Sequence, residues 1–106
     1  MSKIAERLKQ LNIELPAAGA PAAAYVMSAQ TGNTLFLSGH IAKRDGQPLV
    51  GKLGLTMTTD EGKAAARSIA IDLMATMQAH LGNLDRVKRI VKVMSLVNST
   101  ESFTLS

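Results

Sequence analysis

The residues with the most chemical promise lie in the segment from Gly32 to His40, GNTLFLSGH. An apolar run in this segment stops at Ser38-Gly39, and His40 follows directly. Because glycine has no side chain, backbone N–H and C=O groups at the end of a strand can meet a small ligand directly. The Ser38 hydroxyl can add a hydrogen bond. The segment therefore predicts one side of a pocket for a small ligand.

Ser38 and His40 are also residues of the types that serve as nucleophile and general base in covalent catalysis. Alternation along a strand would point both side chains to the same face, so a Ser–His dyad is geometrically possible. No third member of a triad is identifiable, and the chain has no Gly-x-Ser-x-Gly elbow. We therefore favour a hydrogen bond from Ser38 to a ligand or a loop. His40 either lines the pocket or lies on the surface.

Metal and cofactor sites are not expected from this sequence. His40 and His80 are the only histidines, and neither belongs to a spacing typical of metal ligands. We expect His80 at the C-terminal end of a helix, where an imidazolium meets the negative end of the helix dipole. The glycine patterns that hold nucleotide phosphates are also missing. The predicted site thus uses no metal and no cofactor.

One basic run is the best candidate for contact with nucleic acid. It consists of Arg86, Lys88, Arg89 and Lys92, and no aromatic residue is interleaved with it. Proteins that bind single strands usually combine such charges with aromatic stacking platforms. The net charge of +4 is only mildly basic. Solvated charges beside a strand are therefore the favoured interpretation, and a nucleic-acid partner is not expected.

Length and composition limit the class of protein. A chain of 106 residues with 46% apolar residues is expected to form one domain with an aliphatic core. Such a small core favours an oligomer. The absence of cysteine excludes disulfides, thiolate catalysis and cysteine-ligated clusters, and it fits the cytoplasm. The charged N-terminal segment resembles neither a signal peptide nor a membrane span, so no membrane contact is expected.

A β-hairpin is expected to position the Ser38-Gly39 segment. Residues 24–29 and 34–38 alternate like strands, with Tyr25 in the first, and Thr31-Gly32-Asn33 supplies the turn. A short helix capped by Ser2 precedes them, over residues 1–14, and Asn12 tolerates the left-handed conformation at its end. A Pro/Ala connector over residues 15–23 joins helix and hairpin.

A long helix is expected from Thr59 to Leu81. Thr58 and Glu61 have the spacing of a capping box, and Gly82 can end the helix. Between the hairpin and this helix, residues 43–48 predict a polar loop with a turn at Asp45-Gly46, and residues 49–55 a short third strand or an extended segment. The apolar face expected for the helix consists of Ala66, Ile69, Ala70, Leu73, Met77 and Leu81.

The last predicted strand spans Val87 to Val97 and has apolar residues on both faces, which is typical of a strand covered on both sides. Residues 98–101 then predict another helix start, with Phe103 as its first apolar anchor. Together these elements predict an α+β fold with helices on one face of a mixed sheet. The hairpin and this strand are expected side by side, forming half of a crevice that a neighbouring protomer completes.

The order of these motifs resembles the Rid/YjgF family, also called endoribonuclease L-PSP or translation-inhibitor-like. The resemblance rests on Tyr25, on Leu35-Phe36-Leu37-Ser38-Gly39-His40, on the long helix with Gly82-Asn83-Leu84-Asp85-Arg86-Val87, and on Val91-Lys92-Val93 followed by Phe103. The N-terminal helix and Glu61-Gly62-Lys63-Ala64-Ala65 are similar to the branch with an extended N-terminus. The resemblance covers nearly the whole chain.

This resemblance implies a chorismate-mutase-like fold, a homotrimer and ligand clefts between subunits. The implied activity is cofactor-free hydrolysis of reactive enamines and imines, such as 2-aminoacrylate, to a 2-keto acid and ammonia. Tyr25, Ser38, Gly39 and His40 are the implied substrate-binding residues. The family's arginine, in an Arg-Ser-Ala segment, and its water-orienting glutamate would fall after Ser106. We therefore expect an incomplete domain over residues 1–106 that lacks the C-terminal third, and the catalytic residues stay unknown.

Three functions remain open at this point. The first is a Rid-like deaminase, in which these residues alone should lack activity. The second is a non-catalytic trimeric protein that binds small carboxylates. The third is an RNA-binding or RNA-cleaving protein.

Overall fold

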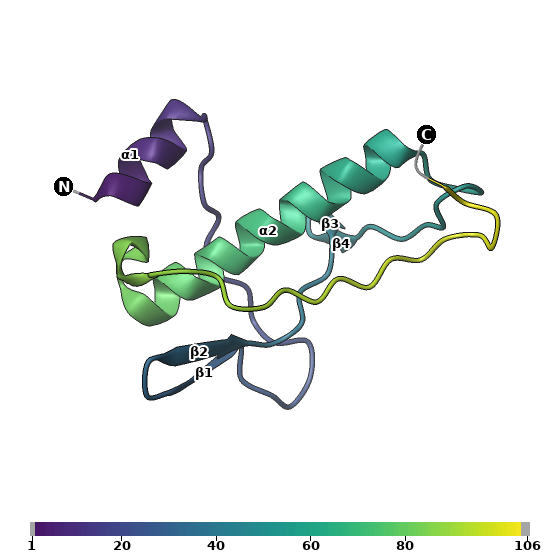
Figure 1. The fold of residues 1–106 in the computed structure, drawn as a ribbon. Coiled ribbons are helices and arrows are strands. Elements are labelled where there is room, and N and C mark those ends of the chain that lie inside the picture. The colour runs from purple at the N-terminus through teal and green to yellow at the C-terminus, as the bar shows by residue number, and fades with distance from the viewer. Residues whose placement is uncertain (1, 105–106) are drawn as a thin grey trace. The chain divides into compact units, whose positions relative to one another are not determined.

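The computed structural model describes residues 2–104 of the chain. Its elements are two α-helices, four short strands and a 3-10 helix (Figure 1), namely α1 (Lys3–Gln10), β1 (Ser28–Thr31), β2 (Thr34–Leu37), β3 (Lys43–Arg44), β4 (Gln47–Pro48), α2 (Thr59–Leu81) and η1 (Leu84–Arg86). The chain divides into two compact units, Met1–His40 with Ala70–Arg89 and Ile41–Ile69 with Ile90–Ser106. The α+β class predicted from the sequence is confirmed.

Helix α1 is shorter than the expected range of residues 1–14, but its capping residues lie where the sequence predicts. The Ser2 hydroxyl accepts a hydrogen bond from the Ala5 N–H at 3.1 Å. Asn12 follows the helix with φ of 57°, the left-handed conformation that asparagine tolerates. A second cap comes from η1, because the Asp85 carboxylate accepts hydrogen bonds from the N–H groups of Lys3 and Ile4, each at 2.8 Å. The Asp85 carboxylate therefore links α1 to η1 within the first unit.

The Asp85→Asn substitution is expected to loosen α1. The hydrogen bonds from Ile4 and Lys3 hold the pKa of the Asp85 carboxyl below its usual range. A lowered folded-state pKa means that the contribution is present at neutral pH and is lost as the pH falls through that lowered value. We therefore expect the protection factors of the Lys3 and Ile4 amides, which correct for the intrinsic pH dependence of exchange, to fall at low pH in the wild type and to be low at every pH in the variant. NMR hydrogen exchange measures both effects.

Asp45→Asn is the matched control for this experiment. Asp45 lies in a turn of the other unit with φ of 52°, and asparagine accommodates that conformation. Unchanged exchange at Lys3 and Ile4 in Asp85→Asn would show that Asp85 does not hold α1.

Strands β1 and β2 form the predicted antiparallel hairpin, with Thr31 opposite Thr34 and a turn through Gly32 at φ of 55°. The first strand begins later than predicted, at Ser28 instead of residue 24. Residues 22–25 form bends, in which the Tyr25 N–H donates to the Ala23 carbonyl at 2.9 Å. Beyond Ser28 the main-chain pairing is limited to one bond, from the Ser38 N–H to the Met27 carbonyl, and a single bond does not extend the strand.

Helix α2 has the predicted bounds and the predicted capping box. The Glu61 N–H donates to the Thr58 hydroxyl at 3.2 Å, and the Thr58 N–H donates to the Glu61 carboxylate at 2.9 Å. The hydrogen bond from the Thr58 N–H, followed by the Thr58 hydroxyl, holds the pKa of the Glu61 carboxyl below its usual range. Gly82, with φ of 81°, follows the helix.

The predicted apolar face of α2 is only partly correct. Ala66 and Ala70 are exposed, whereas the most buried side chains of the helix are Ala75 and Thr76. The face that packs within the first unit carries a hydroxyl because Thr76 meets a ring from the hairpin segment, as described below.

The second unit contains the small β3–β4 hairpin and a tight turn. The predicted turn at Asp45-Gly46 is confirmed, and both residues have positive φ. The possible third strand at residues 49–55 is an extended segment in which Leu53 forms isolated bridges with Met57 and Ser99. The Leu53 N–H donates to the Asn98 carbonyl, and the Thr100 N–H donates to the Leu53 carbonyl, both at 3.0 Å.

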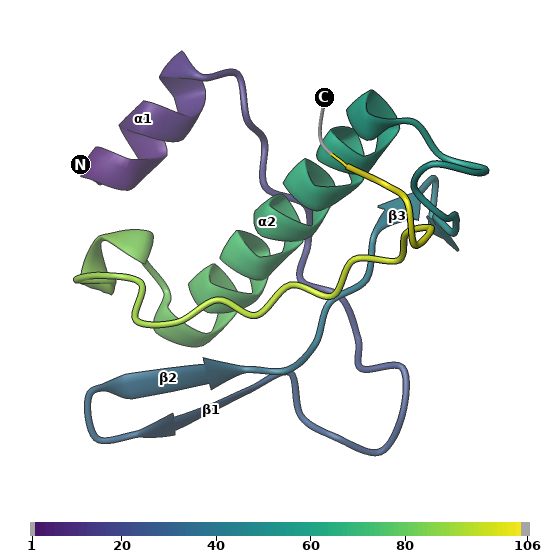
Figure 2. The ribbon, with the colours of Figure 1, turned by 45° about the vertical axis from the view of Figure 1, so that its right-hand side comes forward.

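The predicted strand at Val87–Val97 is absent from the described structure, so this prediction is wrong. The segment is coil (green to yellow in Figure 2), and the side chains of Met94 and Leu96 are 74% and 91% exposed. A strand needs a main-chain partner, and no hydrogen bond joins the backbone of residues 88–97 to another described segment. The sheet expected to join the hairpin to this strand is therefore not formed. The helix start predicted at residues 98–101 is a turn, closed by a bond from the Phe103 N–H to the Thr100 carbonyl.

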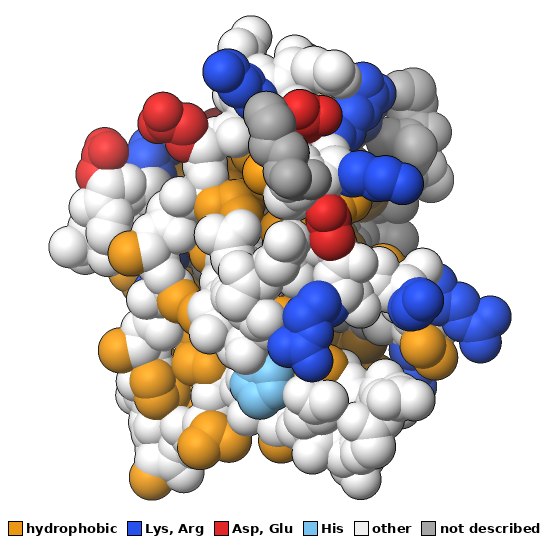
Figure 3. All heavy atoms as spheres, turned by 90° about the vertical axis from the view of Figure 1, so that its left-hand side faces the viewer, with side chains coloured by type: hydrophobic (Ala, Val, Ile, Leu, Met, Phe, Trp, Pro, Cys, Tyr) orange, Lys and Arg blue, Asp and Glu red, His pale blue; other side chains and the backbone are white. Residues whose placement is uncertain are grey.

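Apolar side chains reach the surface in several places, as the orange atoms of Figure 3 show. Among the described residues, the buried apolar side chains are Ala42, Ala75 and Leu84. Across the described range, no helix combines the length and the apolar character that crossing a membrane requires.

Candidate ligand-binding site

Ser38 is held at the end of the hairpin by two hydrogen bonds. Its N–H donates to the Met27 carbonyl at 2.9 Å, and its hydroxyl donates to the Val26 carbonyl. The hydroxyl is thus engaged with the neighbouring chain segment. The sequence predicted a hydrogen bond from Ser38 to a ligand or a loop. In the structure the hydroxyl bonds to the backbone of the segment before β1.

His40 is half-buried, and both of its ring nitrogens have partners. Nδ1 lies 2.7 Å from the Ser38 carbonyl oxygen, and Nε2 lies 2.7 Å from the Thr76 hydroxyl in α2. The ring therefore contacts the backbone of Ser38 and not its hydroxyl. The Ser–His dyad considered from the sequence does not form.

Gly39 lies between these two anchored residues and is open to solvent. A Cβ atom placed on Gly39 would meet no other atom within 4 Å. The N–H groups of Gly39 and His40 have no acceptor among the described residues. Backbone donors beside a residue without a side chain can each donate a hydrogen bond to an anionic ligand. This open segment, which we call the Gly39 rim, comprises Ser38, Gly39 and His40.

Tyr25 lies next to the Gly39 rim in the hairpin connection, because it precedes Val26, whose carbonyl binds Ser38. The Tyr25 side chain is 41% exposed, and its hydroxyl oxygen accepts a hydrogen bond from the Ala22 N–H at 3.3 Å. The phenolic proton stays available as a donor. The structure thus brings the four predicted binding residues into one unit, and the groups that they offer to a ligand are neutral donors.

His80 has the predicted place in the last turn of α2, and its contacts add detail that the sequence did not predict. Its Nδ1 lies 3.3 Å from the Ser28 hydroxyl, and its Nε2 lies 2.9 Å from the Gln30 side-chain oxygen. Both partners lie in β1. His80 therefore joins the hairpin to α2, and we assign it a structural role.

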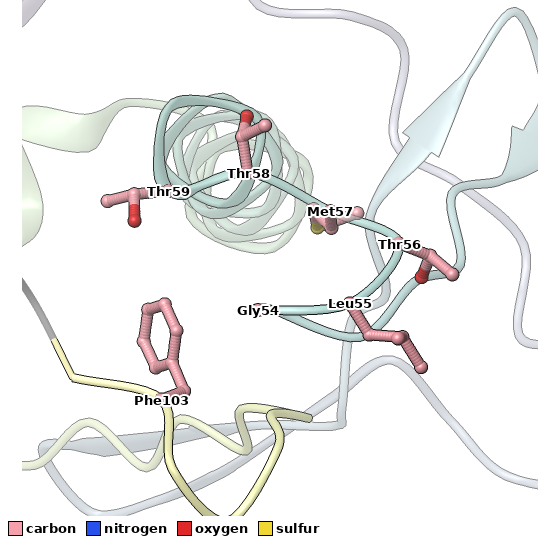
Figure 4. A pocket seen from close by; sticks show the side chains of 7 residues that line it. All are labelled: Gly54, Leu55, Thr56, Met57, Thr58, Thr59 and Phe103. Carbon is pink, nitrogen blue, oxygen red and sulfur yellow. The ribbon is translucent and has the colours of Figure 1, made fainter.

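The second unit contains a separate hollow of about 390 Å³ that the sequence did not indicate. Figure 4 shows the Phe103 ring facing the start of α2 across this hollow, near Gly54. The walls carry threonine hydroxyls and apolar groups and no charged side chain; the lining residues are Gly54, Leu55, Thr56, Met57, Thr58, Thr59 and Phe103. Its polar groups include no anchor for a charged ligand, and we therefore place the candidate site at the Gly39 rim.

Comparison with known proteins gives two relatives. The chain is 48% identical over 103 residues to Protein TCP17 of Trypanosoma cruzi, covering 96% of this chain and 64% of that protein. It is also similar to the crystal structure of a protein from Shewanella oneidensis described as a putative endoribonuclease, with a TM-score of 0.75 and 32% identity over 81% of this chain and 58% of the other. No protein-family model matches the chain. The chain thus spans somewhat less than two thirds of either relative, and its α+β fold is similar to that of the Shewanella protein.

Proposed function

We propose that this chain supplies the ligand-binding rim of a Rid-type protein that acts on small imino or enamino acids, hydrolysing them to a 2-keto acid and ammonia. The observation that carries the proposal is the Gly39 rim, where two free backbone N–H groups lie beside an open glycine. A carboxylate is the group on such a substrate that these donors suit best, because hydrogen bonds to a charged acceptor are stronger than those to a neutral one.

The comparisons support this proposal in a coarser form. The Shewanella protein is described as an endoribonuclease, a name shared with the family that the sequence resembles. The hydrolysis itself needs a fixed anion site and a positioned water. The Gly39 rim contributes neutral donors only, so the arginine and glutamate that the resemblance implies would have to come from elsewhere. We therefore expect this chain to bind carboxylates, and a protein of the relative's full length to turn them over.

Binding is tested by NMR titration of the chain with 2-oxobutyrate, a 2-keto acid product of this reaction class. We expect the Gly39 and His40 amide resonances to shift in a saturable way. The uncharged analogue 2-butanone serves as the control, and it should leave both resonances in place. Shifts that are equal for both compounds, or absent with 2-oxobutyrate, would reject the proposed carboxylate site.

Turnover is tested with freshly generated 2-aminoacrylate, following ammonia and pyruvate. The protein extended to the length of the Trypanosoma relative should accelerate hydrolysis, whereas residues 1–106 alone should not. A rate equal to buffer for the extended protein would leave carboxylate binding without catalysis, which is the second function considered above.

We also propose that the cleft is shared between copies in a homotrimer, as the resemblance implies. The exposed apolar side chains of the chain are consistent with burial against other copies. Sedimentation velocity of the extended protein measures the assembly directly, and a monomer at micromolar concentration would contradict it.

RNA binding or cleavage, the third function considered above, is a further candidate, and the description of the Shewanella protein favours it. The basic residues Arg86, Lys88 and Arg89 lie together in the chain after α2. If they bind RNA, affinity should fall steeply as salt is raised, because phosphate contacts release counterions. Filter binding at two salt concentrations distinguishes this case, and an affinity that is absent or independent of salt would exclude it.

A further inference from the structure

We infer that Thr76 is a positioning residue for the Gly39 rim, acting through the ring of His40. The inference rests on the proposed function, because the proposed function makes the Gly39 rim a ligand-binding segment and Thr76 would hold that segment in place. Its consequence is that a hydroxyl in the C-terminal third of α2, 36 residues from His40 in the chain, controls ligand affinity at the end of β2.

Thr76 is the one buried polar side chain among the described residues, with 3% of its surface exposed. A hydroxyl at a buried position of a helix is costly unless it has a partner. Its partner here is His40 Nε2 at 2.7 Å, and the other nitrogen of the same ring lies 2.7 Å from the Ser38 carbonyl. A continuous series of hydrogen bonds therefore links the helix to the residue before Gly39.

The directions of these two bonds follow from the chemistry of the groups. A carbonyl oxygen can only accept, so Nδ1 must carry a proton. In a neutral ring Nε2 is then the acceptor, and the Thr76 hydroxyl donates to it. The structure thus assigns the Nδ1–H tautomer to His40. This tautomer is the less common one in water, and its presence is a direct sign of the bond from the ring to the Ser38 carbonyl.

The mechanical effect of the series is to fix the peptide plane between Ser38 and Gly39. The Ser38 carbonyl and the Gly39 N–H belong to the same planar peptide group. A ring that holds the carbonyl therefore also sets the direction of the N–H that would meet a ligand. Ser38 is held from the other side by its bonds to Val26 and Met27, so rotation of this peptide is limited at both ends.

The first test needs no ligand. Long-range ¹H–¹⁵N NMR of the wild-type chain should show the Nδ1–H tautomer at His40. In Thr76→Val, which keeps the shape and removes the hydroxyl, Nε2 loses the hydrogen bond that it accepts, so the His40 Nε2 resonance and the Gly39 amide resonance should both shift. Thr76→Ser keeps the hydroxyl and should restore both signals. A wild-type ring in the Nε2–H tautomer, or unchanged signals in Thr76→Val, would overturn the inference.

The second test measures affinity for 2-oxobutyrate. We expect Thr76→Val to weaken binding about five- to tenfold, the effect of about one misplaced hydrogen bond. Thr76→Ser should bind like the wild type. His80→Asn is the matched control, since it removes the other side-chain link between α2 and the hairpin and leaves the Gly39 rim alone. Equal weakening in His80→Asn and Thr76→Val would show a general loosening of the hairpin and would refute the positioning role.

The two tests separate this inference from the proposed function. If the wild type binds no 2-oxobutyrate but the ring and the Gly39 amide respond as expected to Thr76→Val and Thr76→Ser, the proposed function fails and the positioning of the peptide stands. If the wild type binds and Thr76→Val binds equally well, the site stands and the inference is refuted.

Discussion

Gly39→Val is expected to abolish binding of 2-oxobutyrate while the chain stays folded. The valine side chain would occupy the open space at Gly39 and hinder a ligand from reaching the two backbone N–H groups of the Gly39 rim. Each lost hydrogen bond to a charged acceptor contributes about 1.5 kcal/mol or more, so the affinity should fall about 100-fold. Isothermal titration calorimetry of wild type and variant measures this loss.

The fold should tolerate the substitution because the site is open. A Cβ at Gly39 meets no atom within 4 Å, and the residue does not have the positive φ that favours glycine. We expect a change of about 0.5 kcal/mol or less in the free energy of unfolding. Gly19→Val is the matched control, because Gly19 is equally open and lies in the connector before the hairpin. A Gly39→Val variant that binds like the wild type would place the ligand somewhere other than the Gly39 rim.

The parts of the fold that could be predicted are those set by neighbouring residues. The Ser2 cap, the left-handed Asn12, the Gly32 turn and the Thr58–Glu61 capping box each depend on contacts within a few positions of the chain. Such contacts form from local geometry alone, so a short stretch of sequence contains the whole cause. Their positions in the structure agree with the prediction to within a few residues.

The strands that failed depend on partners elsewhere in the chain. Residues 24–27 and Val87–Val97 have strand-like composition, but a strand forms only where another backbone offers donors and acceptors. The described structure provides no such partner for residues 88–97, and these residues stay exposed. Composition therefore indicates that these segments can form strands, and the presence or absence of a pairing partner decides whether they do.

The candidate site shows the same division. The position of Ser38, Gly39 and His40 at the end of a strand could be predicted from a glycine after an apolar run. The roles of the two polar side chains could not, because they depend on Val26 and Thr76, which are distant in sequence. Thr76 gives no signal of its own, since a single threonine on a helix is ordinary until its burial is known.

Gly54→Ala is expected to destabilise the chain strongly through the second unit. Gly54 has φ of 88°, a region that costs a residue with a side chain about 1–2 kcal/mol. A Cβ there would lie 2.7 Å from the Thr100 hydroxyl oxygen and 3.4 Å from the Phe103 ring. Overpacking of this kind costs about 1–3 kcal/mol more. We expect urea unfolding to show a total loss of about 2–5 kcal/mol in the free energy of unfolding.

Two further variants divide this loss between its causes. Gly32 also has a positive φ, at 55°, but a Cβ at this position would meet nothing within 4 Å. Gly32→Ala should therefore lose only the part of the free energy of unfolding that comes from the backbone conformation. Thr100→Ala removes the hydroxyl that the new methyl group would meet, and the double variant should therefore recover part of the packing share. If Gly54→Ala loses no more than Gly32→Ala, and Thr100→Ala does not change the result, the turn at Gly54 does not pack against residues 100–103. In that case the hollow beside Phe103 would lack the wall that the structure gives it.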